Sequence, residues 1–215
     1  MNVEHKIQIN KTDTIAIYYN ESVDCDGLDV RQEFYELINK TKRKSKYRRA
    51  HEWCCGHGAI GYKILQEDLC HHLVLTDKFK LATDCCQLTA LNNNLLCVSI
   101  YNCDSLGHLP KSEKWDLFVA NPPWRFMSMP GERSGSDDLR KMVDKDWAVH
   151  KNMWTYLPEY LTEDADIYLY EDTRYSNEHT WKKYIENAGL KLLSVYRNFG
   201  IGPRTGYIMH IIKKD

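Results

Sequence analysis

The sequence predicts an α/β fold: a seven-stranded, mostly parallel sheet with a terminal antiparallel strand and helices on both faces. At 215 residues, 43% of them apolar, the chain can bury the core of one such domain. Short apolar runs alternate with helix-length segments from residue 49 to residue 189, a pattern typical of a buried parallel sheet. The last two strand-like runs are joined by residues 200–204 alone, which is too short for a helical crossover, so they are expected to pair antiparallel.

The first 48 residues are expected to cap the site and are too few for an independent domain. Runs rich in β-branched and aromatic residues predict strands at 6–9 and 14–19, and Asp29 is placed to cap a helix that ends near Lys40. Residues 49–215 form the main domain. Its expected strands are 49–53, 73–76, 98–101, 115–120, 166–170, 191–199 and 205–212, and its expected helices are 59–66, 81–91, 146–161 and 177–188.

The composition argues against a membrane protein and against a global attraction to polyanions. No apolar run approaches the ~20 residues that cross a bilayer, and the N-terminus lacks the apolar core of a signal peptide, so we expect a cytoplasmic protein. The net charge is −1. The exception is Lys40–Arg49, where seven of ten residues are basic. This run is either a nucleic-acid contact or a solvated helix end.

The eight cysteines predict no metal site. None form a C-x-x-C pair, and the two adjacent pairs, at 54–55 and 85–86, have the wrong spacing for ordinary zinc ligation. Most lie in apolar stretches, where cysteine behaves as a small hydrophobic residue. We therefore expect reduced, mostly buried thiols.

A glycine turn follows the first strand of the main domain. Residues 52–58 read Glu-Trp-Cys-Cys-Gly-His-Gly, and the glycines at 56 and 58 let the backbone pass close to a ligand. The same turn could hold pyrophosphate in a dinucleotide-binding enzyme, or could be structural only. His57 adds a bulky side chain between Gly56 and Gly58.

Two acids follow the next two strands. Asp77 comes 19 residues after Gly58, at a strand end where a carboxylate can accept both hydroxyls of a ribose. Its alternative role is an ordinary helix cap. Asp104 follows the strand at 98–101, where it is either a ligand contact or a turn residue.

The most specific motif is Asn121-Pro122-Pro123-Trp124, directly after the strand at 115–120. It places a carboxamide, two residues with a fixed backbone angle and an aromatic ring at one strand end. Such a rigid arrangement is suited to orienting a flat polar group, and orientation of this kind supplies a large share of many catalysed rate gains. A chance turn is the alternative.

These four features, in this order between residues 52 and 124, resemble those of class I S-adenosylmethionine (SAM) methyltransferases, which have a Rossmann-like fold. The resemblance implies SAM as cofactor and S-adenosylhomocysteine as product. In such enzymes the glycine turn holds the methionine part of SAM, and the two acids hold the ribose and the adenine amino group. The cofactor-binding residues implied for this chain are Glu52 (at the amino end), Cys54, Gly56, Gly58, Asp77, Asp104 and Asn121. Many relatives have a glycine where Cys54 stands, so the turn is expected to avoid a positive φ there.

Relatives with an Asn-Pro-Pro-aromatic motif methylate a planar nitrogen. There the asparagine oxygen and the first proline carbonyl accept the hydrogens of the target amino group, and the aromatic ring stacks on it. The resemblance thus implies Asn121, Pro122 and Trp124 as catalytic residues, with Trp124 also binding the substrate. No strong base is required, because the positively charged sulfur makes the methyl group reactive.

Other residues are candidates for the acceptor side. Glu171 follows the strand at 166–170, near the edge where ligands of open sheets bind, although an acid there also suits the start of a helix. His150 either contacts the substrate or is an ordinary exposed histidine, and Tyr19 is expected to reach the site from the N-terminal segment. Residues 127–137 are either a substrate lid or a surface excursion.

The core at 50–125 is similar to release-factor glutamine methyltransferases, and the whole chain resembles a little-characterised bacterial methyltransferase group. The residues that carry the second resemblance are Tyr18, Tyr19, Asp26, Gly27, Glu52, Trp53, Cys54, Trp115, Asp116, Asn121, Pro122, Pro123, Asp146, Trp147 and His150.

The leading hypothesis is a SAM-dependent N-methyltransferase acting on a planar amide or amine nitrogen of a small molecule or a protein side chain. The alternative acceptor is N6 of adenine in RNA or DNA, with Lys40–Arg49 as the expected contact. A non-catalytic SAM-binding scaffold is motivated by Cys54 and His57 in the glycine turn. An NAD-dependent oxidoreductase would leave residues 121–124 unexplained. Nothing in the sequence predicts the oligomeric state.

Overall fold

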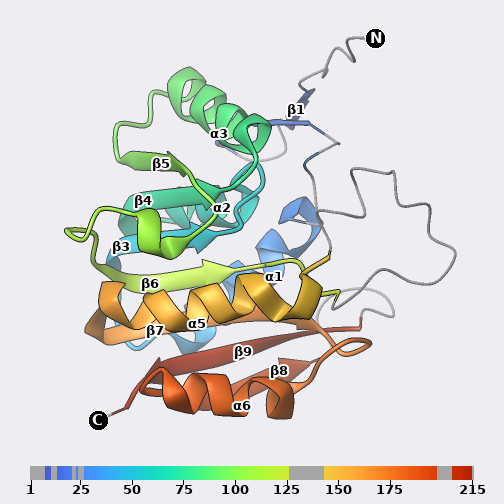
Figure 1. Ribbon diagram of the computed structural model, residues 1–215. Coiled ribbons are helices and arrows are strands. Elements are labelled where there is room, and N and C mark those ends of the chain that lie inside the picture. The colour runs from blue at the N-terminus through green and yellow to red at the C-terminus, as the bar shows by residue number, and fades with distance from the viewer. Residues whose placement is uncertain are drawn as a thin grey trace, which may run out of the picture.

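The computed structural model describes residues 8–10, 14–20, 23, 27–125, 143–197 and 205–214. Its centre is a seven-stranded sheet in the order β5-β4-β3-β6-β7-β9-β8 (Figure 1). The strands from β5 to β7 are mutually parallel, and β9 runs antiparallel to both of its neighbours, β7 and β8. The predicted sheet, with its terminal antiparallel strand, is confirmed.

The strands of the large sheet are β3 (Tyr47–Trp53), β4 (Cys70–Asp77), β5 (Val98–Asn102), β6 (Trp115–Ala120), β7 (Leu161–Asp172), β8 (Leu190–Arg197) and β9 (Gly206–Lys213). The helices are α1 (Gly27–Thr41), α2 (Ala59–Gln66), α3 (Lys80–Asn92), α5 (Ala148–Tyr160) and α6 (Glu178–Asn187), with short 3-10 turns η2 (Leu106–His108) and η3 (Lys145–Trp147). A separate antiparallel pair joins β1 (Gln8–Asn10) to β2 (Ile17–Tyr19).

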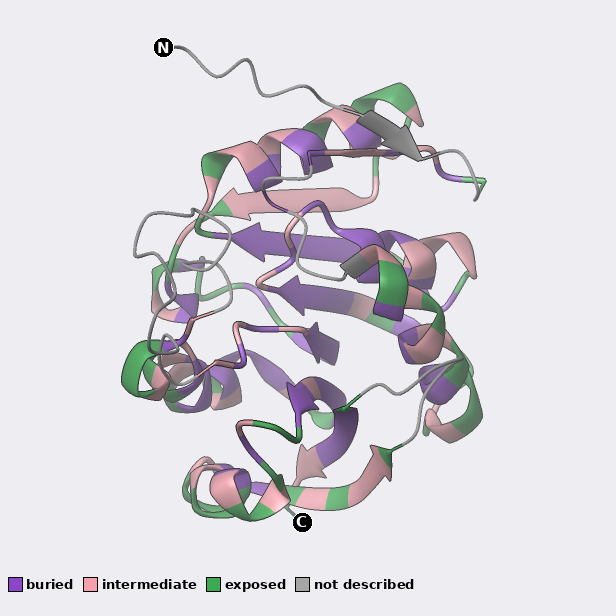
Figure 2. Ribbon diagram, turned by 90° about the vertical axis from the view of Figure 1, so that its right-hand side faces the viewer, coloured by how far each residue is buried: buried purple, intermediate pink, exposed green. Residues whose placement is uncertain are grey.

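Two hydrophobic layers cover the two faces of the sheet. One contains Phe34 and Ile38 of α1 and Ile60 of α2, packed on residues such as Leu73 and Leu75 of β4. The other joins α5 and α6 to the opposite face of β6, β7 and β9. Successive residues of a strand point to opposite faces, so a strand buried on both sides is apolar throughout. The inner strands are coloured as buried in Figure 2.

Two boundaries differ from the prediction around α5. The helix expected at 146–161 begins only at Ala148, because Asp146 and Trp147 have left-handed backbones with φ of 55° and 57°. It ends at Tyr160, and Leu161 already belongs to β7, where it is paired with Trp115. The helix therefore enters the domain through a sharp turn next to the carboxyl ends of the strands.

The N-terminal segment lies along the helices of one face. The backbone N–H of Tyr18 donates to Thr89 Oγ1 at 2.9 Å, and that of Ala16 donates to Asn93 Oδ1 at 2.9 Å, so β2 is attached to α3. Helix α1 packs against α2. Asp29 lies inside the first turn of α1 instead of capping it.

Two features named in the sequence analysis lie outside the described residues: Asp26 in the N-terminal segment, and the loop at 127–137 that is either a substrate lid or a surface excursion. No helix in the described part of the chain is long and apolar enough to span a membrane.

Candidate functional site

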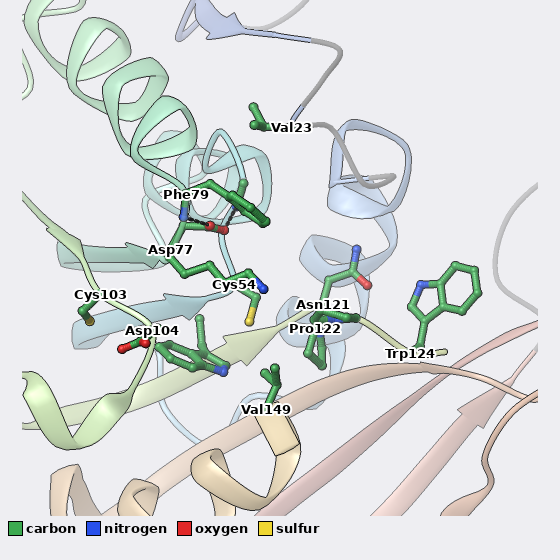
Figure 3. A pocket seen from close by; sticks show the side chains of 14 residues that line it. Val23, Cys54, Asp77, Phe79, Cys103, Asp104, Asn121, Pro122, Trp124 and Val149 are labelled. Atoms are coloured by element: carbon green, nitrogen blue, oxygen red, sulfur yellow. Dashed lines mark hydrogen bonds between the residues drawn. The ribbon is translucent and has the colours of Figure 1, made fainter. Parts of the chain in front are cut away.

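A cavity opens at the carboxyl ends of β3, β4, β5 and β6. The sheet order changes direction between β3 and β6, and ligands of open α/β sheets bind at such a switch point. The cavity holds about 670 Å³, counting space that opens to solvent, which is within the usual ~300–1,000 Å³ of small-molecule sites. Predicted site residues that line it are Cys54, Gly56, Asp77, Asp104, Asn121, Pro122 and Trp124 (Figure 3).

The glycine turn corrects one expectation. Cys54 has φ of +54°, in the left-handed region that the sequence analysis excluded for it, and Gly56 and Gly58 have φ of +53° and +79°. The left-handed Cys54 lets the next N–H, from Cys55, donate to Thr76 O at 3.0 Å. Continued pairing with β4 offsets the ~1–2 kcal/mol that a non-glycine residue spends in this conformation.

Glu52 is buried behind the turn and does not line the cavity. Its Oε2 accepts a hydrogen bond from the Gly61 N–H at 2.7 Å, in the first turn of α2, and a carboxyl group is favourable at a helix N-terminus. A Cβ added at Gly61 would lie 2.8 Å from Glu52 Oε2, so only glycine permits this approach. Burial raises the pKa of Glu52 to about 8. The structure thus places the carboxyl group of Glu52, a residue of β3, against the first turn of α2.

Asp77 ties the turn to the end of β4. Its Oδ2 accepts from the Gly56 N–H at 2.9 Å and its Oδ1 from the Phe79 N–H at 2.8 Å, the contacts drawn as dashes in Figure 3. The side chain is almost fully buried, and burial raises its pKa. A carboxylate has about four acceptor positions, so two remain after these bonds. Asp77 can therefore accept two hydroxyl groups from a ligand without releasing the turn.

Asp104 lines the cavity just beyond the end of β5 and is exposed. Its Oδ1 lies 3.2 Å from His108 Nδ1, one turn further along η2. The lining also includes residues that were not predicted as site residues: Val23, Trp53, Lys78, Phe79, Cys103 and Val149. Trp53, Phe79 and Val149 supply apolar surface between the polar groups. Phe79 could have been found from its place two residues after Asp77, and Trp53 from its place in the glycine-turn motif, whereas Val149 carries no local signal.

Asn121 and Pro122 extend the end of β6 into the cavity. They line it together with Gly56 and Asp77. Asn121 is half-buried and Pro122 is buried. Figure 3 shows Asn121 between Cys54 and Trp124. The structure therefore brings the predicted clamp and the predicted cofactor turn to one space.

Trp124 is packed more closely than the sequence analysis expected. Only 6% of it is exposed, and its ring centre lies 5.4 Å from that of Tyr175. The guanidinium carbons of Arg174 and Arg125 lie 5.3 Å and 5.5 Å from the Trp124 ring centre. The indole thus forms part of a cluster of two rings and two guanidinium groups at the edge of the cavity.

His150 and Glu171 lie beside the cavity rather than in its wall. His150 Nε2 is 2.6 Å from Glu171 Oε1, its Nδ1 is 2.6 Å from Asp144 Oδ2, and all three side chains are fully buried. Burial alone would lower the pKa of His150, but the Glu171 and Asp144 carboxylates raise it to about 9. The alternative of an exposed histidine is therefore wrong. The network fixes the start of α5, which carries Val149 into the cavity.

Two other candidates, Tyr19 and Gly58, also lie outside the cavity lining. Tyr19 packs against His57, a residue of the glycine turn, with ring centres 5.8 Å apart. Gly58 is the residue before α2, and a Cβ there would lie 2.9 Å from Leu75 Cδ1. These residues shape the glycine turn from its protein side.

The basic run at 40–49 lies at the start of β3, whereas the cavity lies at its end. The seven residues of β3 rise ~3.3 Å each, so about 20 Å separates the two. Four of its seven basic side chains pair with carboxylates: Arg43 with Asp166, Lys44 with Asp116 and Asp164, Lys46 with Asp68, and Arg49 with Glu113. Much of its charge is neutralised within the fold.

The cysteines of the described residues are all free thiols, and four of them are buried: Cys55, Cys70, Cys85 and Cys86. Burial raises the pKa of Cys55 well above its usual range. Within the described part of the chain, no three His, Cys, Asp or Glu side chains are grouped to hold a metal ion.

Comparison with known proteins gives a family match over part of the chain. Residues 33–132 match the sequence model of the methyltransferase small domain. No curated protein sequence matches the chain.

Solved structures share the fold. The chain is similar to the ribosomal protein L11 methylase of Lactobacillus delbrueckii subsp. bulgaricus, with a TM-score of 0.61 and 13% identity, over 86% of this chain and 79% of that one. It is similar to M. jannaschii TYW2 in complex with AdoMet, with a TM-score of 0.62 and 13% identity, over 98% and 86%. It also resembles the T. thermophilus 16S rRNA N2 G1207 methyltransferase (RsmC) in complex with AdoMet and guanosine, with a TM-score of 0.66 and 12% identity, over 97% of this chain and 50% of that one. The fold is that of the Rossmann-like methyltransferases.

Proposed function

We propose that the chain is a SAM-dependent methyltransferase that transfers the methyl group to a planar amide or amine nitrogen. The observation that carries the proposal is the shared cavity of Asn121 and Pro122 with Gly56 and Asp77. A carboxamide oxygen and a proline carbonyl oxygen accept hydrogen bonds and do not donate them, so they suit a hydrogen-bond donor such as an NH2 group. Their place beside the cofactor turn makes nitrogen the expected nucleophile.

The residues of the cavity fit SAM. The two remaining acceptor positions of Asp77 suit the ribose hydroxyls, and Asp104 suits the adenine amino group. Gly56 and Cys54 would face the methionine part, and Trp53 and Phe79 provide the apolar walls that small-molecule sites require. Bound SAM supplies a methyl group on a positively charged sulfur.

The role of the protein in the reaction is orientation. Asn121 Oδ1 and the Pro122 carbonyl hold the two hydrogens of the acceptor nitrogen, which turns its lone pair towards the methyl carbon. Bound SAM would supply the methyl group: the new N–C bond would replace the S–C bond, whose electron pair would stay on sulfur. The methylated nitrogen then loses one proton to water. Orientation before reaction can supply several kcal/mol of a lowered barrier, about 7–11 in the best cases.

The acceptor is a small molecule or a protein side chain. Adenine in RNA or DNA is the alternative, and the names of the RNA-modifying structural neighbours favour it. The basic run at 40–49 does not support it, because this run lies far from the cavity and is largely paired. The position of Val23 in the cavity wall supports the proposal that the N-terminal segment caps the site.

The proposal is tested by replacing Asn121→Ala. Turnover is expected to fall at least about 100-fold, because orientation is lost, while SAM affinity by calorimetry stays within a few-fold of the wild type. The matched control is Asn92→Ala, an exposed asparagine on α3. Labelled SAM with fractionated lysate first identifies whether protein, nucleic acid or small molecules accept the label. Unchanged turnover of the Asn121 variant would contradict the mechanism, and absence of SAM binding at millimolar concentration would favour a scaffold.

A further inference from the structure

The turn that follows β7 brings an arginine and a tyrosine to the motif at the end of β6. Arg174 and Tyr175 both contact the Trp124 ring, at 5.3 Å from the guanidinium carbon and 5.4 Å between ring centres. The Arg174 guanidinium also lies 5.5 Å from the Tyr175 ring centre. Trp124 itself lines the cavity and is only three residues beyond Asn121. A cation and two rings therefore stand next to the proposed clamp.

The orientation of Arg174 is fixed by a buried acid. Its Nε lies 3.0 Å from both carboxylate oxygens of Asp172, and its Nη2 lies 2.6 Å from Oδ2. Asp172 is only 3% exposed, whereas the Arg174 side chain is 53% exposed. The backbone N–H of Arg174 also donates to Asp172 Oδ1, at 2.8 Å. The inner edge of the guanidinium is thus bound to protein, and the group is held while part of it faces solvent.

The turn that carries Arg174 is anchored on both sides. Glu171 before it contacts His150, and Ser176 after it donates to Glu171 Oε2 at 2.9 Å. Ser176 Oγ also lies 3.0 Å from Tyr207 OH, so the turn is connected to β9. These groups are buried, and buried polar networks that are satisfied hold a single conformation. This explains why the two carboxylates at 171 and 172 precede the turn.

We propose that Arg174, Tyr175 and Trp124 form an acceptor-binding surface that selects planar acceptors carrying an anionic group near the nitrogen to be methylated. This inference rests on the proposed function. Guanidinium groups stack on flat rings and donate hydrogen bonds to carboxylate or phosphate oxygens with their free edge, and they bind such anions better than lysine does. The Arg125 guanidinium, 5.5 Å from the same ring, adds a second positive charge to this edge of the cavity. The surface supplies both the stacking and the charge that such an acceptor needs.

An ion pair that only stabilises the turn is the competing explanation for Arg174. Arg197 provides the comparison, because it also pairs with an acid, Glu178, and lies 5.7 Å from a tyrosine ring centre, that of Tyr207. Its side chain is 44% exposed, close to the value for Arg174, but it is not next to the cavity motif. A purely structural role predicts similar effects of removing either arginine. Acceptor selection predicts an effect for Arg174 alone.

The experiment compares acceptors in matched pairs that differ in charge. The pairs are adenosine with adenosine monophosphate, and 4-aminobenzamide with 4-aminobenzoate. Methyl transfer is measured as kcat/KM, and binding is measured by calorimetry on protein saturated with S-adenosylhomocysteine. The proteins are the wild type, Arg174→Gln and Arg197→Gln. Arg174→Lys is added because it keeps the positive charge but lacks the planar guanidinium that donates paired hydrogen bonds.

The wild type should favour the anionic member of at least one pair, and Arg174→Gln should reduce this preference about ten-fold or more, the usual effect of removing a charge-assisted hydrogen bond. The neutral member should be affected much less, and Arg197→Gln should keep the wild-type preference. An adenine-containing oligonucleotide is tested in the same way. If it binds more strongly than the mononucleotide, the anionic group is a phosphate within a nucleic-acid strand; if it binds equally, the anionic group belongs to a small molecule.

Two results would overturn the inference: equal binding of both members of each pair, or a preference that survives in Arg174→Gln. A failure to bind any of the anionic ligands would overturn it too. The proposed function is judged separately, because it depends on label entering nitrogen and on the Asn121 variant. Methylation of neutral amines without any charge preference would leave that function standing while removing the role of Arg174.

Discussion

The pH dependence of stability should report the state of one buried carboxyl group, that of Glu52. Replacing Glu52→Gln keeps an oxygen that accepts the Gly61 N–H and removes the titratable proton. Glutamine has nearly the same shape as glutamate. Because the side chain is only 2% exposed, the change introduces no new contact with solvent. A comparison of the two proteins therefore isolates the charge.

The magnitude follows from the shift in pKa. Burial raises the pKa of Glu52 to about 8 in the folded protein, whereas an unfolded glutamate titrates near ~4.3. Between these values the unfolded chain has lost the proton and the folded protein keeps it, so the free energy of unfolding falls as pH rises. The slope is about 1.4 kcal/mol per pH unit, or roughly 2.7 kcal/mol from pH 5.5 to 7.5. This contribution is fully present below the unfolded pKa and is lost as pH rises through the folded one.

The assay is urea unfolding of both proteins at pH 5.5 and pH 7.5. Shifted groups that do not interact with Glu52, such as His150, titrate equally in both proteins and cancel in the difference. The glutamine variant should gain about 2–3 kcal/mol relative to the wild type over this range. Parallel pH profiles would show that Glu52 is ionised in the folded state at neutral pH, and would refute the argument from burial.

The same variant tests whether Glu52 meets the amino end of SAM. A contact with the ammonium group would favour the ionised carboxyl, so SAM binding at pH 7 would release a proton from the wild type and none from the glutamine variant. Because Glu52 is bound to the Gly61 N–H and lies outside the cavity lining, we expect no such release. Calorimetry in buffers of different ionisation enthalpy measures it directly.

Three further predictions concern the turn, the cofactor and the buried network. Gly58→Ala should lower the free energy of unfolding by about 2–4 kcal/mol, since the new Cβ is strained and lies 2.9 Å from a leucine methyl group; Gly189→Ala, with φ of +69° and nothing within 4 Å, should cost about 1 kcal/mol. Equal urea midpoints for these two variants would contradict the packing argument. Asp77→Asn should weaken SAM binding about ten-fold or more by calorimetry, and an unchanged Kd would exclude its ribose contact. Asp144→Asn should cost on the order of 3 kcal/mol below pH 6.5, and the gap to the wild type should narrow as pH rises through about 9, where His150 loses its proton. A gap that is independent of pH would show that His150 is neutral in the fold.

The sequence predicts the sheet and its helices well because hydrophobic period is a local property. Helix α2 and strand β6 have the predicted bounds, and the antiparallel end of the sheet follows from the short connection at 200–204. The strand ends that carry Asp77 and Asn121 are local features too. The residues that meet in the cavity could therefore be identified from their positions after apolar runs.

What could not be predicted depends on contacts between distant segments. The burial of His150 requires Asp144 on one side and Glu171 on the other, which meet only when α5 packs on the end of β7. The positive φ of Cys54 is set by pairing with β4, and nothing in its own neighbours indicates it. The local preference of a non-glycine residue for a negative φ therefore gave the wrong prediction at Cys54, because pairing with β4 overrides that preference.

The role of an arginine that pairs with β7 depends on which end of this strand holds it. Asp166 and Asp172 belong to this one strand, six residues and about 20 Å apart, and each holds an arginine. Asp166 accepts from Arg43, from Tyr47 OH at 2.7 Å and from His210 Nε2 at 2.8 Å, and burial raises its pKa less than these three partners lower it. That end of the strand is a closed structural network.

Asp172 lies at the other end of β7, and its arginine reaches the ring that follows the Asn-Pro-Pro motif. A count of charges along the sequence favours the run at 40–49, because seven of its ten residues are cations and Arg174 is alone. Burial reverses this order, since carboxylates pair four of those cations within the fold, whereas the one acid that holds Arg174 leaves the guanidinium half exposed beside the cavity. Binding of an anionic acceptor should therefore depend more on Arg174, at the carboxyl edge of the sheet, than on the whole basic run at the opposite edge.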